Sequence, residues 1–593
     1  MRNFFKYTLA SLLALFLFLG MSISGLLFLV ILTASRDPVP KVKDKSILSF
    51  DLGLNITDGL QTPVDGFGQA LGNQLEGISL KATLDAINQA ARDRRIVALY
   101  LHGEMTGGAG YAQLKEIRDA LQRFRASGKK IIAYDLDWGE REYYLASVAD
   151  TILMHPFGSL ELNGLSSEGT FFAGALQKYG IGVQVTRVGK YKSAVEPFLL
   201  TQRSPENRQQ TQQLLGDLWG ELRGAIAKAR NITPQQLQAI ADNDGILEPN
   251  EAIQRKLVTK TAYEDEVIEQ LKQIGTEDDE SFRQINLSSY ATVAQNQLEK
   301  GRNANQKIAV VYAEGDIVNG RGDVDQIGGD RFAKILREIR QDEDVKAVVL
   351  RVNSPGGSAV ASEVIQREVI LTRKEKPVVV SMGSVAASGG YWIATYSDRI
   401  FAEPNTITGS IGVFGLLPNI QQLGNNNGVT WDAVKTARFA DIQTVTRAKT
   451  PQEMALIQKS VDRIYDQFLT RVADSRKLPK ARVAEIAQGR VWSGIQAKAI
   501  GLVDELGGLE AALQDAAKRA KLGDKWQLAE YPQPRSFTEL LFDSPNSQMT
   551  KLFESKDPVL MELQKLKAEV ALLGNLNDPL SAYARLPFNF RID

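Results

Sequence analysis

The sequence has 593 residues, more than one hydrophobic core supports, because single cores stop growing near about 250 to 300 residues. Two to four domains are therefore expected. The composition is that of a globular protein, with 44% hydrophobic and 24% charged residues. Because 70 Lys and Arg balance 70 Asp and Glu, there is no basic excess for a polyanion, and we expect no nucleic-acid partner.

Cysteine is absent, and histidine occurs only as His102 and His155. Disulfides, thiol nucleophiles and cysteine-based metal sites are therefore excluded. A Ser-His-Asp triad or a multi-histidine metal site has almost no material to use. The sequence predicts neither a metal site nor a cofactor.

Residues 1–45 are predicted to form a single-pass membrane anchor. No residue is charged from Tyr7 to Ser35, which exceeds the roughly 20 residues that cross a bilayer as a helix. The alternative, a cleaved signal peptide, has an apolar region of only about 7 to 15 residues. Positive charges lie on both sides of the span, so they do not set its orientation. Since long domains translocate whatever the nearby charge, we expect the body to be extracytoplasmic.

Two similar halves follow the anchor, residues 46–300 and residues 301–532. Strand-like runs begin at Ser46 and Lys307, and later runs in the two halves stay in step. Alternating strands and helices predict an α/β fold in each half, with a parallel sheet and βαβ crossovers. Residues 533–593 form a tail with a stretch of helical spacing. This stretch is expected to pack on the protein's own body, and a partner helix or a membrane surface is the alternative.

The second half contains a candidate nucleophile. Residues 378–392 predict a buried strand, a turn of small residues and a helix that begins near Ser388. Free N–H groups at a helix start favour an alkoxide and an oxyanion. Gly357, after the preceding strand, and Gly389 are predicted to form an oxyanion hole. Taken alone, however, a serine before glycines at a helix start is usually only an N-cap.

The first half lacks this nucleophile. Counting back from the paired Asp398 and Asp150, the position of Ser388 falls on Glu140. A duplicated domain that keeps the Gly-Ser-rich turn in one copy and charges in the other indicates that the first copy has taken a different role.

That role is indicated by Lys192, which follows an apolar strand and is surrounded in sequence by small and apolar residues. A lysine normally titrates near about 10.4, but desolvation can lower its pKa by several units. Without a usable histidine, a neutral lysine is the side chain left to activate a serine. The alternative is a solvated surface lysine, as most lysines are. Arg438 lies near the counterpart position in the second half and cannot act as a base.

Four motifs, residues 189–198, 353–358, 383–391 and 408–415, resemble the signal peptide peptidase A (protease IV) family in its long, duplicated form. The resemblance covers nearly the whole chain, including the anchor. It implies two tandem βαβ domains with the fold of the Clp protease and crotonase superfamily, preceded by a transmembrane helix.

By motif position, the resemblance implies that Ser388 is the nucleophile, Lys192 the general base, and Ser410 a residue that orients the lysine. It implies a serine endopeptidase that degrades cleaved signal peptides and similar apolar peptides at a membrane. A homo-oligomer such as a tetramer is expected.

Two other functions are alternatives, and the sequence disfavours both. A non-catalytic membrane quality-control scaffold would tolerate the loss of Ser388 or Lys192, and a crotonase-like acyl-CoA enzyme would have no reason for a membrane span. Whether Ser388 and Lys192 meet within one protomer or between protomers is open.

Overall fold

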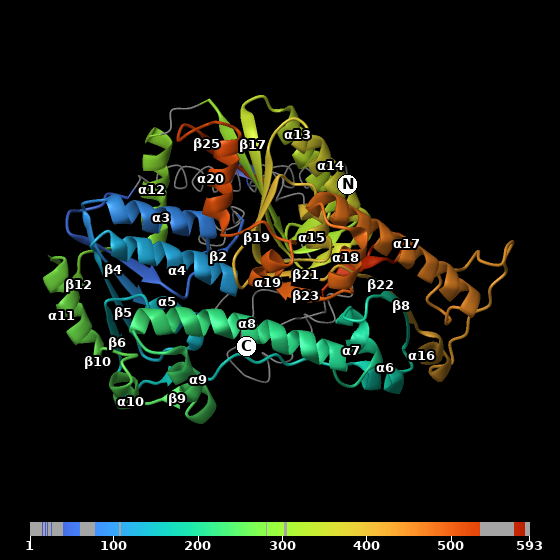
Figure 1. Ribbon diagram of the computed structural model, residues 1–593, viewed down its shortest axis with the longest axis horizontal. Coiled ribbons are helices and arrows are strands. Elements are labelled where there is room, and N and C mark those ends of the chain that lie inside the picture. Colours follow the sequence, from blue (N-terminus) through green and yellow to red (C-terminus); the bar gives the residue numbers. More distant parts are fainter. Residues whose placement is uncertain are drawn as a thin grey trace, which may run out of the picture.

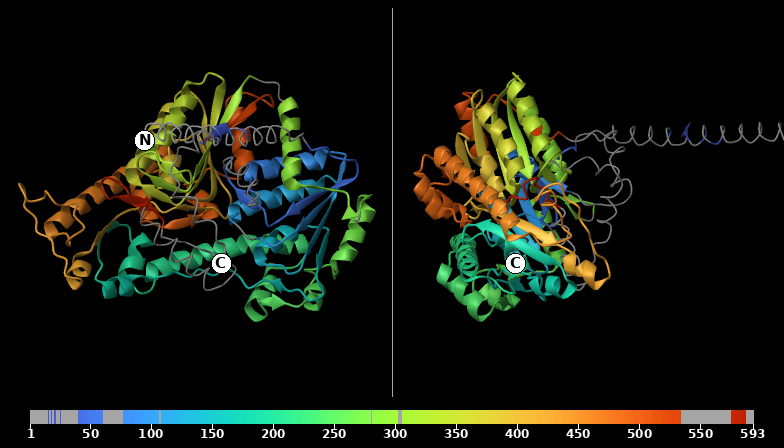
Figure 2. Two further views of the ribbon diagram at one scale, coloured as in Figure 1. Left: turned by 180° about the vertical axis from the view of Figure 1, so that it is seen from behind. Right: turned by 90° about the vertical axis from the view of Figure 1, so that its right-hand side faces the viewer.

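The computed structural model describes, besides isolated positions among the first 39 residues, residues 40–59, 77–105, 108–279, 281–301, 305–533 and 575–586. The two halves of the chain lie side by side, with the blue and cyan strands of the first half next to the yellow-green strands of the second (Figures 1 and 2). Within the described ranges, no helix is long and apolar enough to span a bilayer. The predicted span at residues 7–35 and the predicted helical stretch at residues 558–573 lie outside these ranges.

The first half contains a six-stranded parallel sheet in the order β10-β6-β5-β4-β1-β13. In chain order its strands are β1 Ser46–Asp51, β4 Ile96–His102, β5 Lys130–Asp135, β6 Thr151–Met154, β10 Lys260–Thr261 and β13 Gln284–Asn286. The helices packed on it are α3 Leu80–Arg92, α4 Tyr111–Ala126, α5 Glu140–Ala146, α11 Glu264–Ile274 and α12 Leu287–Gly301.

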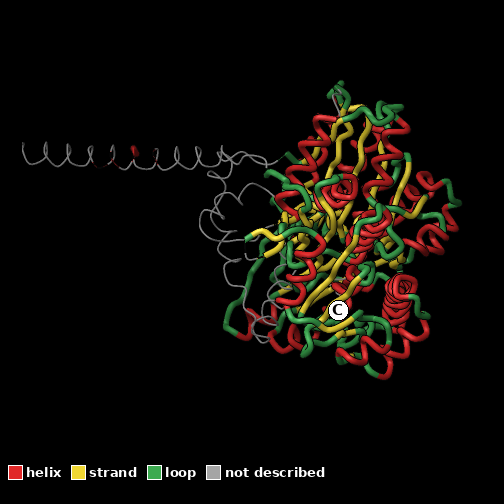
Figure 3. The backbone as a smooth tube through the Cα atoms, turned by 90° about the vertical axis from the view of Figure 1, so that its left-hand side faces the viewer, coloured by secondary structure: helices red, strands yellow, loops and turns green. Residues whose placement is uncertain are grey.

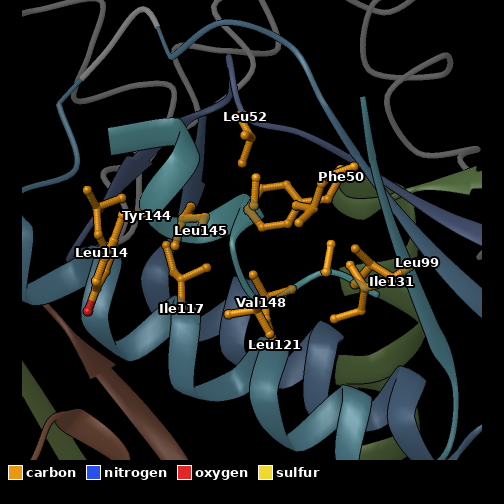
Figure 4. Packing of buried hydrophobic residues seen from close by; sticks show 14 of the residues in the cluster. Phe50, Leu52, Leu99, Leu114, Ile117, Leu121, Ile131, Tyr144, Leu145 and Val148 are labelled. Carbon is orange, nitrogen blue, oxygen red and sulfur yellow. The ribbon is translucent and has the colours of Figure 1, made fainter. Parts of the chain in front are cut away.

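Both faces of this sheet are buried because successive strand residues point to opposite sides. Leu48 and Phe50 belong to the core shared with α3, α4, α5 and α12, whereas Ile47, just before Leu48, belongs to the core shared with α11. Figure 4 shows the first of these cores, where Phe50 of β1 packs near Leu145 and Val148. The near-continuous apolar runs of the strands are therefore explained by two covered faces.

The second half repeats this plan with an eight-stranded sheet in the order β23-β21-β19-β17-β14-β25, to which β20 and β24 are added beside β19. In chain order its strands are β14 Lys307–Glu314, β17 Val345–Ser354, β19 Val378–Ala387, β20 Arg399–Ala402, β21 Ile407–Gly409, β23 Val491–Ser493, β24 Glu505–Leu506 and β25 Gln527–Tyr531. Its helices include α13 Gly329–Gln341, α14 Ala359–Arg373 and α15 Gly389–Ala394 on one face and α20 Leu509–Arg519 on the other. Figure 3 shows strands inside and helices outside.

The same tyrosine hydrogen bond occurs in each half and shows which residues of the two halves are equivalent. The Tyr143 hydroxyl of α5 donates to the carbonyl of Leu257, and the Tyr391 hydroxyl of α15 donates to the carbonyl of Leu502, each at 2.7 Å. This equivalence of Tyr143 and Tyr391 makes Glu140 the counterpart of Ser388, as predicted by counting.

A third sheet joins segments from both halves and from the tail. Its order is β16-β15-β18-β26-β22-β8. The strands are β8 Gly182–Val188, β15 Asp316–Val318, β16 Gln326–Gly328, β18 Gly356–Ser358, β22 Val413–Asn419 and β26 Tyr583–Arg585. The first-half strand β8 pairs antiparallel with β22 along its whole length. The last part of the first half is thus built into the second.

Two further contacts hold the halves together. The guanidinium of Arg351 on β17 is fully buried and contacts the carboxylates of Asp58 and Glu116 from the first half, each at 2.7 Å. The long helix α8 (Pro205–Arg230) packs under both halves, where the hydroxyl of Ser493 donates to the carboxylate of Asp217.

The other helices and strands connect these layers. They are β2 Asn55–Thr57, β3 Gly77–Ser79, β7 Leu160–Glu161, α6 Ala173–Tyr179, the 3-10 helix η1 Ser193–Val195, α7 Glu196–Leu199, α9 Pro234–Asn243, β9 Ile246–Leu247, α10 Pro249–Gln254, β11 Glu277–Asp278, β12 Ser281–Phe282, α16 Gln421–Asn426, α17 Pro451–Arg476, α18 Lys480–Ile486 and α19 Gly494–Ala499.

Candidate active site

Strand β8 and the turn after it place Lys192. The strand ends at Val188, and Gly189 turns the chain with a φ of 103°, a conformation that favours glycine. The backbone N–H of Lys192 then donates to the Gly189 carbonyl at 3.1 Å. A β-carbon on Gly489 would lie 2.6 Å from the β-carbon of Lys192, so a glycine there lets the lysine stem pass. The side chain enters the second half, where it is fully buried.

Ser388 lies between the end of β19 and the start of α15. Its φ of 56° and ψ of −113° are unusual for a residue with a side chain, and such strain is kept where the surrounding structure enforces it. The backbone N–H of Ser388 donates to the carbonyl of Gly409 at 2.8 Å, which holds the turn. Helix α15 begins at the next residue, Gly389, as the sequence predicted.

Lys192, Ser388 and Ser410 meet within one chain and are each fully buried. Lys192 Nζ lies 2.8 Å from Ser388 Oγ, 3.0 Å from the carbonyl oxygen of Ser410 and 3.0 Å from Ser410 Oγ. Ser410 is itself held by its backbone N–H, which donates to the carbonyl of Arg490 at 2.7 Å. The three residues therefore form one hydrogen-bonded group, although they come from both halves.

Burial lowers the pKa of the Lys192 ammonium well below its usual value, because the charged form loses its hydration. A neutral lysine amine has two N–H donors and one lone pair. The two oxygens of Ser410 can accept from the donors, which leaves the lone pair to accept the Ser388 hydroxyl proton. This geometry suits a base that activates a serine.

The two glycines predicted to form an oxyanion hole lie on neighbouring elements. Gly357 is the middle residue of β18, and Gly389 is the first residue of α15. A β-carbon on Gly356 would lie 2.6 Å from the backbone nitrogen of Gly389, so the two segments approach closely. Gly357 therefore lies on a segment that packs against the residue after Ser388, and backbone N–H groups in such a place can stabilise an oxyanion.

Strand β26 from the tail lies between β18 and β22, next to these glycines. Its register places Ala584 opposite Gly357, and a β-carbon on Gly389 would lie 3.0 Å from the carbonyl oxygen of Ala584. Arg585 contacts Asp316 of β15 through its guanidinium at 2.8 Å. Sequence reasoning missed this segment and Asp316; the one signal was a short apolar run, residues 582–584, after a polar stretch.

Each half has a different residue at the position equivalent to the other half's site residue: Glu140 is the predicted counterpart of Ser388, and Arg438 that of Lys192. Glu140 accepts a hydrogen bond from the Gly164 N–H at 2.6 Å, and burial raises the pKa of its carboxyl. Arg438 lies in an exposed segment between α16 and α17, far along the chain from β22. Lys192 lies 12 residues before Ser204, the N-cap of α8, and Arg438 lies 12 residues before Thr450, the N-cap of α17, so Arg438 keeps its predicted place in the second repeat.

Comparison with known proteins places these features in a family. A model of peptidase family S49 matches residues 123–277 and again residues 370–523. The chain is 38% identical to "Protease 4" of Salmonella typhi, covering 87% of this chain and 86% of that protein. It is 32% identical to "Serine protease SPPA, chloroplastic" of Arabidopsis thaliana, covering 84% of this chain and 73% of that protein.

Among solved structures, a mutant of ClpP1 from Listeria monocytogenes matches with 15% identity and a TM-score of 0.24, covering 37% of this chain and 99% of that chain.

The match to a peptidase family and the similarity to named proteases define a serine protease, and the buried serine lies beside a lysine whose pKa is lowered by burial. More particularly, the chain belongs to peptidase family S49, whose domain it contains twice. The family resemblance and the duplication expected from the sequence are both confirmed.

Proposed function

We propose that the protein is a membrane-anchored serine endopeptidase that degrades cleaved signal peptides and similar apolar peptides with a Ser388–Lys192 dyad. The observation that carries this proposal is the 2.8 Å separation of Lys192 Nζ and Ser388 Oγ in a fully buried site. The similarity to proteases across most of the chain supports it.

In the first half of the reaction, neutral Lys192 accepts the proton of the Ser388 hydroxyl, and Oγ attacks the carbonyl carbon of the scissile peptide bond. The N–H groups of Gly357 and Gly389 stabilise the oxyanion of the tetrahedral intermediate, a contribution of about 3 to 4 kcal/mol per donor in related chemistry. Lys192 then gives its proton to the leaving amine. The C–N bond breaks, and the acyl group stays on Ser388 Oγ as an ester.

In the deacylation step, Lys192 accepts a proton from a water molecule, and this water attacks the ester carbonyl. Collapse of this intermediate breaks the bond to Oγ, and Lys192 returns the proton to Ser388. Ser410 keeps the amine aimed at Ser388 throughout, because its two oxygens hold the other N–H groups. One lysine thus serves as base and acid in both steps.

An apolar substrate agrees with the surroundings of strand β26. Tyr583 packs in a cluster with Phe198, Phe414 and Leu416, of which Phe198 comes from the first half. A peptide strand in the same place would meet the same apolar walls. The substrate class is therefore proposed to be extended apolar peptides.

The wider organisation is part of the proposal. Residues 1–45 are the anchor, residues 46–300 and 301–532 the two Clp- and crotonase-like repeats, and residues 533–593 the tail. The body is extracytoplasmic, and the protein works as a homo-oligomer. The uncharged run from Tyr7 to Ser35 supports the anchor. Extraction of the full chain from membranes by alkaline carbonate would contradict it.

The test is turnover of an internally quenched apolar peptide by the detergent-solubilised full chain and by Ser388→Ala. The variant is expected to lose activity by about 10⁴-fold or more, while Ser397→Ala, a buried serine outside the site, keeps it. Labelling of the wild type by a fluorophosphonate, with the label mapped to Ser388, gives a second readout. Substantial turnover by Ser388→Ala would refute the dyad and favour a scaffold with a contaminating protease.

A further inference from the structure

Strand β26 occupies the place that a bound peptide would need. It is antiparallel to β18, which carries Gly357, and to β22, and it lies between them. The backbone N–H of Leu586 donates to the Pro355 carbonyl at 2.8 Å, and that of Ala359 donates to the Ala582 carbonyl at 3.2 Å. Backbone hydrogen bonds therefore hold the tail as an extended strand. A peptide substrate is held in the same way when it binds by adding a strand to a sheet.

The register of this strand identifies which of its bonds faces the nucleophile. The carbonyl oxygen of Ala584 is close to Gly356 and to Gly389, the residue after Ser388. The bond at the position of attack is thus the one between Ala584 and Arg585. Ala582 and Ala584 are both fully buried, so only small side chains fit at these two positions. Alanines at alternate positions also end the signal peptides that signal peptidases release.

Arg585, directly after that bond, enters a polar pocket. Its side chain is 6% exposed, and its guanidinium lies 2.8 Å from Asp316 Oδ1, which is 10% exposed. The other carboxylate oxygen of Asp316 accepts from the side-chain amide of Asn575 at 2.8 Å. Asp316 is therefore a nearly buried carboxylate whose described partners both belong to the tail. When a substrate replaces the tail, this carboxylate needs a new cation.

We infer that Asp316 is a specificity-determining residue, which selects a basic side chain at the residue that follows the scissile bond. This inference rests on the proposed peptidase function. A site with a buried charge discriminates strongly against a substrate that leaves the charge unpaired, because the lost hydration is not replaced. An acidic residue at the same position adds repulsion to that loss.

The test compares two internally quenched peptides, Ser-Ala-Tyr-Ala-Arg-Leu-Pro-Phe and the same peptide with Glu in place of Arg, as substrates of the full chain. We expect the wild type to prefer the Arg peptide by about tenfold or more in kcat/KM. Mass spectrometry should locate the cut after the second alanine. Asp316→Asn should reduce the preference to about threefold or less, and Asp316→Lys should invert it. Because both kcat/KM values are measured on the same protein, their ratio does not depend on how strongly the tail competes with the substrate.

Asp330→Asn is the matched control, since Asp330 is an exposed aspartate in the first turn of nearby α13. It should keep the wild-type ratio. Equal cleavage of both peptides by the wild type, or an unchanged Arg preference in Asp316→Lys, overturns the inference and leaves the protease proposal intact.

Failure of the protease proposal has a different signature: the wild type and Ser388→Ala then cleave each peptide equally. In that case, binding of the two fluorescently labelled peptides to Ser388→Ala still tests the pocket. The inference expects tighter binding of the Arg peptide, and equal binding overturns it.

Discussion

Lys192 Nζ lies 2.8 Å from Ser388 Oγ although the two residues are 196 positions apart in the sequence. The contact depends on strand β8, which leaves the first half and pairs with β22 of the second. Neither half contains both groups. The site is therefore a property of the docked halves, and its chemistry can be tested separately from its folding.

Replacing the lysine by a neutral side chain of similar length should abolish activity without loss of structure. Lys192→Met keeps most of the volume and removes the base, so kcat/KM is expected to fall by about 10³-fold or more. The same variant removes a buried amine that is costly to desolvate, so its thermal midpoint should equal or exceed that of the wild type. Retained turnover would show that Lys192 is not the base.

The pH dependence follows from the lowered pKa of Lys192. Activity requires the neutral amine, so kcat/KM should rise with pH and level off well below 10.5, the ordinary lysine value. Stability changes in the same direction. Because the folded-state pKa is depressed, the unfolded chain binds more protons between the two pKa values, and the free energy of unfolding rises with pH through that window. Lys192→Met should lack this slope. A kcat/KM that is still rising beyond about pH 10 would contradict the assignment.

Ser410 is expected to position the amine. Ser410→Ala removes one of the two Ser410 acceptors for Lys192, so kcat should fall by about 10-fold to 100-fold, with little change in KM. Loss of that hydrogen bond should also shift the pH at which kcat/KM reaches half its plateau, which a purely structural role would not do. Ser397→Ala, which removes another buried serine hydroxyl, serves as the control. An unchanged pH profile would exclude the positioning role.

The ion group of Arg351, Asp58 and Glu116 should contribute strongly to the docking of the halves. Arg351→Met leaves two buried carboxylates without their shared cation, which is expected to cost about 3 to 5 kcal/mol in the free energy of unfolding. Arg337→Met removes an exposed arginine from Glu368 while Arg340 still pairs with that carboxylate, so it should cost less than about 1 kcal/mol. Urea unfolding of the full chain, followed by tryptophan fluorescence, measures both. Equal losses in the two variants would refute the special role of the buried group.

The tail strand should compete with substrate. Arg585→Glu places a carboxylate against Asp316, so the strand should leave the site more often and kcat/KM for a peptide without charges should rise by about 3-fold to 10-fold. Combining it with Asp316→Lys restores an opposite pair and should return the value toward that of the wild type. The tail keeps a second attachment in both proteins, since the hydroxyl of Ser358 donates to Asp578. Additive effects of the two substitutions would argue against a direct pair.

Local patterns were sufficient to predict much of the site. Ser388 stands in a run of small residues after a buried strand, and Lys192 follows an apolar strand, so both could be found from neighbouring residues. The duplication could be found because equivalent strands recur in the same order in both halves. These are features that the chain carries within short segments.

The pairing of β8 with β22 and the return of β26 could not be predicted in this way. A three-residue strand has no periodicity of its own, and its partner is chosen by the edge that the folded body offers. The role of Asp316 could not be predicted either, because it depends on a contact with Arg585, which lies 269 positions later in the sequence.

The distribution of the catalytic groups along the chain also orders events during biosynthesis. Ribosomes add about 5 to 20 residues each second, and domains fold as units from the amino terminus. Lys192 is therefore made well before Ser388 and Ser410, and the nascent first half has no hydrolytic capacity while it emerges. Residues 583–585 come nearly last and cover the site soon after it assembles. The order of synthesis therefore keeps the group of Lys192, Ser388 and Ser410 incomplete until the second half has been made.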